Sequence, residues 1–463
     1  MPSTRAEFHE TATLIPVAQH LARVLRAMGD LAARRAGDDV EHVRLADAAG
    51  RTLAASVDAR LASPPFDNSA MDGFAVRWAD VAGATPEHPV ALRVVDDHAA
   101  GAAGVADAAP LGPGEAARIM TGAPVPPGAD TVVPVERTDG GATVQGDHAQ
   151  RVAIFSTPDR GRHIRRAGED LRVGDRVLEV GTVLGARQVA GAATAGHATL
   201  PVTRMPRVSV VATGSELAEP GEPLGPGHIP DSNSLLLAGL VREAGCLVAE
   251  VVRMPDDAEQ LRTWLAERQP CDAVVFSGGV SVGAYDVVRR VLGSGESGAV
   301  EFVRVAMQPG SPQAFGVLAD GTPVFGLPGN PVAVAVSFEV FVRPALLALQ
   351  GRCDVRRRRV LAQVASGWAS PAGRLQVMPV SFVTPDADAD ADADADAASD
   401  AGSASPAESP TGPTGLPRVR PAASGGAGSH LSGGLAGADG FALVPEHLAS
   451  VAPGDTVEVL VLP

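Results

Sequence analysis

Three loops in the second half of the chain combine glycine with polar and acidic side chains. They read TGSE at 213–216, SGG at 277–279 and GLPGNP at 326–331, and each follows a short apolar run. Glycine lets backbone N–H groups approach a ligand closely, and a helix that follows directs its positive dipole end at that ligand. The three loops together predict a binding site for an anion or a nucleotide.

Acidic residues on or beside these loops modify this prediction. Glu216, Asp286 and one of the neighbours Asp256 and Asp257 would repel a phosphate group unless a hard cation lay between them. Carboxylates together with a phosphorylated ligand are the usual setting of Mg²⁺. We therefore expect Mg²⁺ here, with Glu216, Asp286 and Asp257 as its ligands. The histidines show no HxxxH or HxH spacing, so a zinc site is not expected.

Three further segments in the first half concentrate polar side chains among glycines. They read PFDNSAMDGFAVR at 65–77, IMTGAPVPPGAD at 119–130 and GRHIRRAGED at 161–170. The last contains Arg162, Arg165 and Arg166, a local basic cluster in an acidic protein, which suggests an anionic ligand. We call these three segments the motif loops.

The composition excludes several kinds of chemistry. The chain has no lysine, and its net charge is −16. A coding bias towards GC-rich codons explains the missing lysine best. A lysine Schiff base, a lysine general base and a P-loop ending in GK[ST] are all impossible, so such roles would fall to arginine, a metal or backbone N–H groups. Unaided nucleic-acid binding needs a basic face and is not expected.

The elements that must position these residues change in character along the chain. Helical spacing of apolar residues predicts an amphipathic helix over 13–35, and short β-like runs follow over 43–134. Residues 153–201 resemble a small β-rich unit with a helix near 186–195. From residue 207, strands alternate with helices, which predicts a mainly parallel sheet with helices on both faces. The strands expected there are 208–212, 247–252, 273–277 and 324–326, and the helices are 232–243, 258–267, 287–292 and 331–349.

The end of the chain returns to β-like runs at 360–364 and 456–461, on either side of a long insert. The insert, 385–427, begins with alternating Asp and Ala and continues with Pro, Ser and Gly, so we expect it to be disordered. It lacks the glycine turn of a calcium-binding loop. Three unclustered cysteines and no visible signal peptide predict a cytoplasmic protein without disulfides. The apolar stretch 332–349 contains Glu339, Arg343 and Pro344, and this favours a buried helix over a membrane span.

Seven of the segments together resemble the molybdopterin molybdenumtransferase family, which includes the E domain of gephyrin. They are FDNSAMDGFAVR, IMTGAPVPPGADTVVP, IRRAGED, TGSEL, SGGVSVGAYD, QPGSPQAFG and GLPGNP. The resemblance implies a multidomain α/β protein with a central doubly wound molybdopterin-binding domain, β-rich N-terminal domains and a C-terminal domain like a β-barrel. The implied boundaries are 12–55 plus 152–204, 56–151, 205–350 and 351–463.

The resemblance also implies an activity. Members insert molybdate into adenylylated molybdopterin with the help of Mg²⁺, and they release AMP and molybdenum cofactor. It implies a homodimer whose subunits share the active site and a contact with the adenylyltransferase, and no binding to membranes or nucleic acid. Residues carried over as functional are Asp72, Thr121, Asp170, Glu216 and Asp286. Residues carried over as binding positions are Ser277, Gly278, Gly279, Ser281, Gln308, Ser311, Pro328, Pro331, Arg374 and Ser429.

This chain departs from the family pattern in two places. Many members read KPGKP where residues 308–312 read QPGSP, and residues 284–285 are Ala-Tyr where an acidic residue often follows the glycine. Arg374 and Arg304 are the nearest candidates to supply the missing positive charge. Two alternatives stay open, an adenylyltransferase that only activates molybdopterin and a non-catalytic binding or scaffold protein. The first typically has a TGGTG-type loop, and SGGVS stands here instead.

Overall fold

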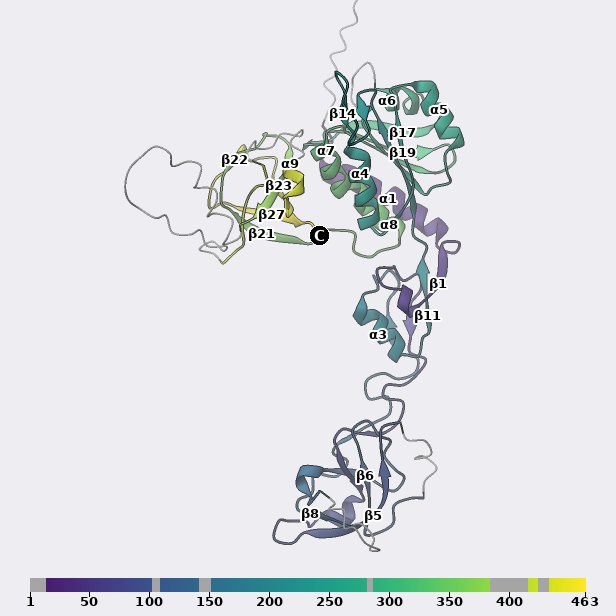
Figure 1. Cartoon of the computed structure of the whole chain (residues 1–463), viewed down its shortest axis with the longest axis vertical. Helices are drawn as coiled ribbons and strands as arrows, with labels where there is room; N and C mark the ends of the chain where they lie inside the picture. Colours follow the sequence, from purple (N-terminus) through teal and green to yellow (C-terminus); the bar gives the residue numbers. More distant parts are fainter. Residues whose placement is uncertain (1–13, 102–108, 141–150, 281–285, 384–414, 424–432) are drawn as a thin grey trace, which may run out of the picture. The chain divides into compact units, whose positions relative to one another are not determined.

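The computed structural model describes residues 14–101, 109–140, 151–280, 286–383, 415–423 and 433–463 (Figure 1). The chain forms two compact units. Unit 1 contains residues 1–41 and 203–463, and unit 2 contains residues 42–202. Each unit is described by itself.

A six-stranded sheet is the centre of unit 1, with the strand order β15-β12-β16-β20-β19-β17. The first four strands are parallel, and the last two are antiparallel to their neighbours. In sheet order the strands are β15 (Leu247–Met254), β12 (Arg207–Thr213), β16 (Ala273–Ser277), β20 (Pro323–Leu327), β19 (Pro312–Leu318) and β17 (Gly298–Arg304). The predicted parallel strands are confirmed, whereas β17 and β19 were not predicted.

Helices cover both faces of this sheet, as its two apolar cores show. One core packs α1 (Val17–Arg35), α4 (Asn233–Glu243) and the helix that begins at Pro331 against one face. The other core packs α5 (Ala258–Glu267) and α6 (Val287–Leu292) against the opposite face. Figure 1 shows α4 and α5 on different sides of the strands. The doubly wound arrangement is therefore confirmed.

The apolar helix from Pro331 to Leu349 is continuous but not uniform. It consists of α7 (Pro331–Ser337), a π-helical turn (Phe338–Val342) and α8 (Arg343–Leu349). The wide turn ends two residues before Pro344, which has no N–H to donate to the preceding turn. Among the described residues this is the one helix long and apolar enough to cross a membrane, and 83% of its apolar window is buried within the structure. It is a core helix, as predicted.

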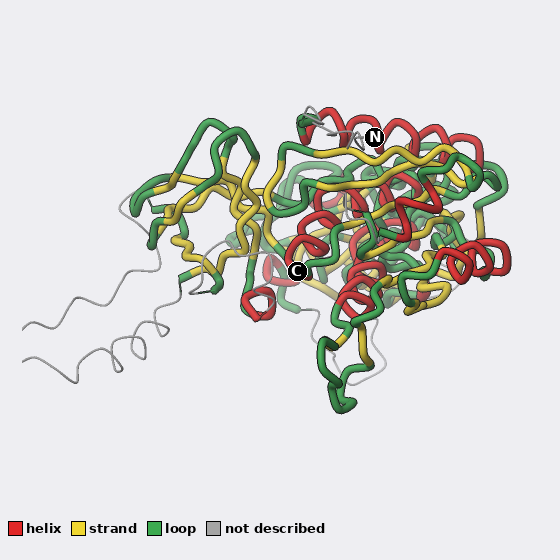
Figure 2. Tube along the Cα trace, turned by 90° about the horizontal axis from the view of Figure 1, so that it is seen from above, coloured by secondary structure: helices red, strands yellow, loops and turns green. Residues whose placement is uncertain are grey.

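The C-terminal strands of unit 1 close into a barrel. The ring runs β23-β24-β21-β27-β25 and returns to β23, and the short β18 (Met307–Gln308) is added beside β23. Figure 2 shows this region as strands and loops around a common interior. The ring strands are β21 (Arg359–Val364), β23 (Leu375–Phe382), β24 (Arg418–Pro421), β25 (Gly440–Val444) and β27 (Thr456–Val461). The paired strands β22 (Trp368–Ala369) and β26 (Ser450–Val451) and the helical turn α9 (Gly433–Ala436) complete this region.

One expectation for this region was partly wrong. The insert predicted to be disordered over 385–427 includes β24, which pairs with β21 and β23. Val419 is fully buried in the barrel core, and this burial offsets the cost of ordering a short segment between low-complexity sequences. The rest of the insert, except residues 415–423, lies outside the described residues.

Unit 2 is built mainly from short strands. Its five-stranded sheet has the order β7-β4-β6-β5-β8, and a second core surrounds α3 (Ala186–Thr194). The sheet strands are β4 (Gly73–Val76), β5 (Val90–His98), β6 (Glu115–Ile119), β7 (Thr131–Pro134) and β8 (Arg151–Ile154). The remaining pairs are β1 (Val40–Arg44) with β11 (Thr199–Thr203), β2 (Val57–Asp58) with β10 (Arg176–Leu178), and β3 (Asn68–Ser69) with β9 (Ile164–Arg165). The domain boundaries inferred from the sequence stay a prediction.

Candidate functional site

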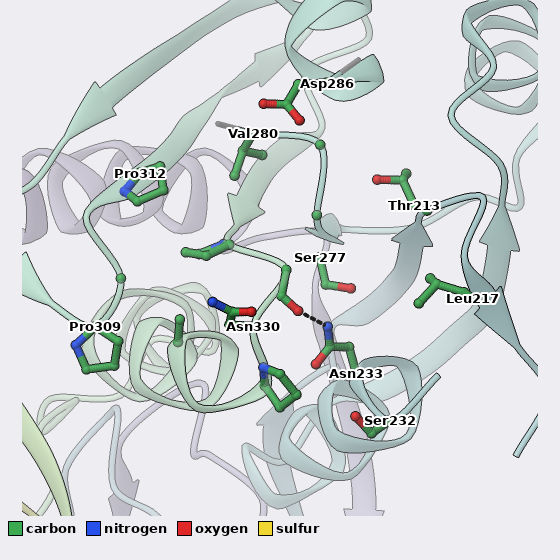
Figure 3. Close-up of a pocket in the computed structure, with 18 of the residues that line it drawn as sticks. Thr213, Leu217, Ser232, Asn233, Ser277, Val280, Asp286, Pro309, Pro312 and Asn330 are labelled. Atoms are coloured by element: carbon green, nitrogen blue, oxygen red, sulfur yellow. Dashed lines mark hydrogen bonds between the residues drawn. The ribbon is translucent and has the colours of Figure 1, made fainter. Parts of the chain in front are cut away.

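The three glycine loops of unit 1 meet at one edge of the six-stranded sheet, as predicted. They line a cavity of about 830 Å³ together with residues 307–312 and Arg374 (Figure 3). We call this cavity the sheet-edge pocket. The loops follow the carboxyl ends of β12, β16 and β20, and residues 308–311 lead into the antiparallel β19 at the same edge. From β12 to β19 there are three strand spacings, about 14 Å, so the pocket suits an elongated ligand.

The SGG loop accepts no side chain larger than hydrogen. Gly278 and Gly279 have φ angles of 89° and 66°. A Cβ atom on Gly278 would lie 2.6 Å from the carbonyl oxygen of Thr213, and one on Gly279 would lie 2.8 Å from Val288 Cγ2. Both the backbone conformation and the close approach of the TGSE loop therefore require glycine here.

Carboxylates gather at the β15–β12 side of the pocket. Glu216, Asp256 and Asp286 line it. Burial raises the pKa of Asp256, and the negative charges of Glu216 and Asp286 raise it further, against a hydrogen bond from the Ser215 backbone N–H. A partly buried carboxylate beside two others attracts a cation.

Asp257 does not line the pocket with these carboxylates, although the sequence predicted it as a metal ligand. Its carboxylate is the N-cap of α5 and accepts the backbone N–H groups of Glu259 and Gln260 at 2.8 and 3.1 Å. Its neighbour Asp256 lines the pocket instead. Because Asp257 caps the start of α5, Asp256 is the one of the two neighbouring aspartates that can face a ligand in the pocket.

The donor set fits Mg²⁺ in its usual protein setting. No group of three or more His, Cys, Asp or Glu side chains in the described part of the chain is close enough to hold a metal ion alone. Mg²⁺ is typically bound by one or two carboxylates, substrate phosphates and water. Glu216, Asp256 and Asp286 can provide such a partial ligand set beside a phosphorylated ligand.

The described segment 307–312, which leads into β19, contributes no acidic side chain to the pocket. Gln308 and Ser311 precede β19, and the pairing of β18 with β23 brings Arg374 to the same place. Arg374 is the one cationic side chain among the described residues that line the pocket, whereas Arg304 does not line it. Of the two arginines considered as substitutes for the missing lysines, Arg374 therefore has the suitable position.

The middle of the pocket contains polar atoms without partners. In the described residues, ten buried side-chain N or O atoms lack a hydrogen bond, and four of them are on pocket residues. These four are Thr213 Oγ1, Asn233 Oδ1, Ser277 Oγ and Ser311 Oγ. Sequence reasoning missed Asn233, although Asp-Ser-Asn before an apolar helix is a signal for a helix start. Pro328 and Pro331 also line the pocket, and Asn330 occupies the N-cap position of α7 with Pro331 in the first turn.

The motif loops of unit 2 come together within that unit. β3 pairs with β9, and the backbone of Ser69 exchanges hydrogen bonds with residues 122 and 123. Asp72 accepts hydrogen bonds from the backbone N–H and the hydroxyl of Thr121, each at 2.7 Å. The backbone N–H first, and then the hydroxyl, hold the pKa of Asp72 below its usual range. Asp72 is thus oriented and ionised before any ligand arrives.

The basic cluster predicted in the third motif loop is partly neutralised. Arg166 forms an ion pair with Asp67, whose carboxylate also accepts the Ala167 N–H. Asp170 is exposed, and its backbone N–H donates to Ser63. Its predicted functional role stays a prediction. Ser281, Ala284, Tyr285 and Ser429 lie outside the described residues.

Comparisons with known proteins agree with these features. Residues 15–196 match the MoeA N-terminal region (domain I and II), residues 209–348 a probable molybdopterin binding domain, and residues 412–462 the MoeA C-terminal region (domain IV). Molybdopterin molybdenumtransferase 2 of Mycobacterium tuberculosis is 48% identical over 340 residues, which are 72% of this chain and 81% of that protein. The chain belongs to the molybdopterin molybdenumtransferase family. The family member of Bacillus subtilis is 37% identical over 341 residues, 73% of this chain and 75% of that protein.

A solved structure supports the same family fold. The molybdopterin biosynthesis MoeA protein of Pyrococcus horikosii superposes with a TM-score of 0.73 at 28% identity, over 97% of this chain and 99% of that chain. The molybdopterin molybdenumtransferase fold therefore extends over both units.

Proposed function

We propose that this chain inserts molybdate into adenylylated molybdopterin and releases AMP and molybdenum cofactor. The observation that carries the proposal is the sheet-edge pocket of a molybdopterin molybdenumtransferase family member, with carboxylates on one side and a single arginine on the other. A substrate with a phosphoanhydride and a dithiolene needs two unlike binding regions, and a pocket about 14 Å across can provide both.

The carboxylate side suits the phosphoanhydride. Mg²⁺ held by Glu216, Asp256 or Asp286 and by the substrate phosphates would neutralise charge as the bond between the phosphates breaks. Gly278 and Gly279 line the pocket without side chains, so their backbone can approach phosphate oxygens closely. One water molecule supplies the oxygen that completes the second phosphate, so that AMP leaves with one phosphate and the molybdopterin keeps the other.

The opposite side suits molybdate. Arg374 can donate two hydrogen bonds to an oxyanion and supplies the one positive charge among the described residues that line the pocket, while Gln308 and Ser311 add neutral donors. Lysine-bearing relatives place two more positive charges in the equivalent segment. This chain should consequently bind molybdate more weakly than they do.

Ser311→Lys tests that consequence. Adding a cation should lower the molybdate concentration for half-maximal cofactor formation by about tenfold, since a charged hydrogen bond to an oxyanion contributes about 1.5 kcal/mol or more. Ser311→Gln adds length and a donor without charge and is the matched control. An unchanged molybdate dependence in Ser311→Lys would show that charge at this position is irrelevant.

Further parts of the proposal come from the family resemblance. We propose a cytoplasmic homodimer in which Asp72, Thr121 and Asp170 of one subunit serve the pocket of the other. The paired and ionised Asp72 supports a catalytic role for the first motif loop. A contact with the adenylyltransferase would deliver the adenylylated substrate without release.

One assay tests the activity. The full-length protein is incubated with adenylylated molybdopterin, Mg²⁺ and molybdate, and AMP and molybdenum cofactor are measured together. The proposal predicts that both products form in equal amounts and that cofactor formation requires molybdate. Adenylylation of molybdopterin from ATP without molybdate insertion would instead identify an adenylyltransferase. Retained pterin binding without turnover would identify a binding protein.

A further inference from the structure

Asn233 has a side chain whose two ends have different surroundings. It is the first residue of α4, lines the sheet-edge pocket and is 8% exposed. Its Nδ2 donates a 2.6 Å hydrogen bond to the carbonyl oxygen of Gly329 in the GLPGNP loop (Figure 3). Its Oδ1 is buried and has no partner.

The hydrogen bond to Gly329 fixes which way the amide points. If the amide were flipped, two oxygen atoms would face each other at 2.6 Å, which is repulsive. Asp231 also holds the start of α4, because its carboxylate accepts the backbone N–H and the hydroxyl of Ser234 at 3.0 and 2.5 Å. Asn233 Oδ1 is therefore a fixed acceptor on a fixed helix end.

This oxygen differs from the three orphaned hydroxyls around it. The hydroxyls of Thr213, Ser277 and Ser311 can rotate and act as donor or acceptor, but an amide oxygen only accepts. An unpartnered buried acceptor costs about 1–3 kcal/mol. A functional site tolerates such a cost because a bound ligand removes it, for example by placing a hydrogen-bond donor against the oxygen.

We propose that Asn233 is a substrate-binding residue whose Oδ1 accepts a hydrogen bond from the exocyclic amino group of a heterocycle in the substrate. This inference rests on the proposed function, because adenylylated molybdopterin has two such amino groups, one on the pterin and one on the adenine. Both present the same chemistry to an acceptor. A site built for this donor rejects an analogue that lacks it, since the buried oxygen would stay unpaired.

The test compares each ring system with its analogue that lacks the amino group. The full-length protein is titrated with AMP and with purine riboside 5′-monophosphate in one arm, and with 6-hydroxymethylpterin and its 2-deamino analogue in the other. In one of the two arms, we expect the native protein to bind the compound with the amino group at least tenfold more tightly than the analogue without it. Asn233→Ala should reduce that ratio to near one, by weakening the amino compound alone. The arm in which this happens identifies the ring.

A second variant separates the acceptor from the bond to Gly329. Asn233→Asp replaces the Nδ2 donor with an oxygen that the Gly329 carbonyl repels, so both members of a pair should bind more weakly. The acceptor oxygen remains, however, and the variant should keep the preference for the amino compound that Asn233→Ala loses. A purely structural Asn233 would instead weaken both members of a pair equally in both variants, which would overturn the proposal. Equal binding of both members to the native protein in both arms would overturn it even if neither variant folded. A native protein that bound neither AMP nor the pterin would contradict the proposed function itself.

Discussion

The polar groups of the sheet-edge pocket in unit 1 and those of the motif loops in unit 2 differ in the partners they have within the chain. In the pocket, Thr213, Asn233 and Ser277 each have a buried oxygen without a hydrogen bond. In the motif loops, all of whose residues the structure describes, Asn68 Oδ1 is the one buried side-chain N or O atom without a hydrogen bond, whereas Asp72 and Asp67 each accept two hydrogen bonds from neighbouring residues. The pocket has the unmet hydrogen-bonding capacity of a binding site, whereas the motif loops form an ordered surface with fixed charges.

This difference indicates a division of roles. Unpartnered groups form hydrogen bonds when a ligand arrives. These bonds lower the free energy of the complex, so the groups contribute to binding. A carboxylate that is already oriented and ionised needs no reorganisation during the reaction, so it contributes to catalysis. Substitutions in unit 1 should therefore mainly affect binding, and substitutions in unit 2 should mainly affect turnover.

The largest effect is expected from Gly278→Ala in the pocket. The new Cβ would lie 2.6 Å from the Thr213 carbonyl oxygen, at a residue with a φ of 89°. We therefore expect the free energy of unfolding to fall by about 3 kcal/mol. We also expect the variant to lose AMP binding. Thermal unfolding and AMP titration measure both. Gly295→Ala is the matched control, because Gly295 has a φ of 81° and nothing within 4 Å of its added Cβ. It should cost only about 1 kcal/mol, and equal costs at the two sites would contradict the close packing of the SGG loop.

A smaller effect is expected from Thr121→Val in unit 2. The variant removes one of two hydrogen bonds to Asp72, so turnover should fall about tenfold while substrate binding changes little. The pKa of Asp72 should rise towards its usual value, and the acid limb of the activity profile should move to higher pH. Thr85→Val, which alters an exposed turn of the same unit, should leave the profile in place. A loss of binding without a change in turnover would contradict the proposed division.

The smallest effect concerns the two neighbouring aspartates after β15. The pKa of Asp256 is raised by burial and by its acidic neighbours, so its ionised form destabilises the fold at neutral pH. Asp256→Asn should therefore raise the melting temperature at neutral pH without metal, and the gain should vanish as the pH falls below the pKa of this carboxyl.

Asp257→Asn should act in the opposite direction. The N–H groups of Gln260 and then Glu259 lower the pKa of Asp257, so its ionised form stabilises the fold above the usual carboxyl pKa. The variant should lower the melting temperature at neutral pH, and the loss should disappear in acid. If both variants shifted the melting temperature in the same direction, the assignment of one aspartate to the pocket and the other to the helix cap would be wrong.

The sequence predicted the parallel strands and their loops because apolar runs followed by glycine are local signals. It did not predict β17 and β19: proline and glycine interrupt the apolar pattern between Gln308 and Gly316, although both strands pair with neighbours along the chain. Nor could it predict the role of Asn233, whose partner Gly329 lies 96 residues away. Local patterns show where loops begin, but the partners of individual side chains depend on the folded arrangement.

The measurement that tests the proposed sharing of the active site between subunits most directly uses two variants, each of which we expect to be inactive alone. Asp72→Ala removes the ordered carboxylate of unit 2, and Asp286→Ala removes a carboxylate of the pocket in unit 1. The two chains are co-expressed with different tags, and the heterodimer is purified and assayed for AMP release. If each site combines unit 2 of one subunit with the pocket of its partner, one of two sites is intact and about half of the native activity returns. A heterodimer as inactive as either variant alone would contradict the account.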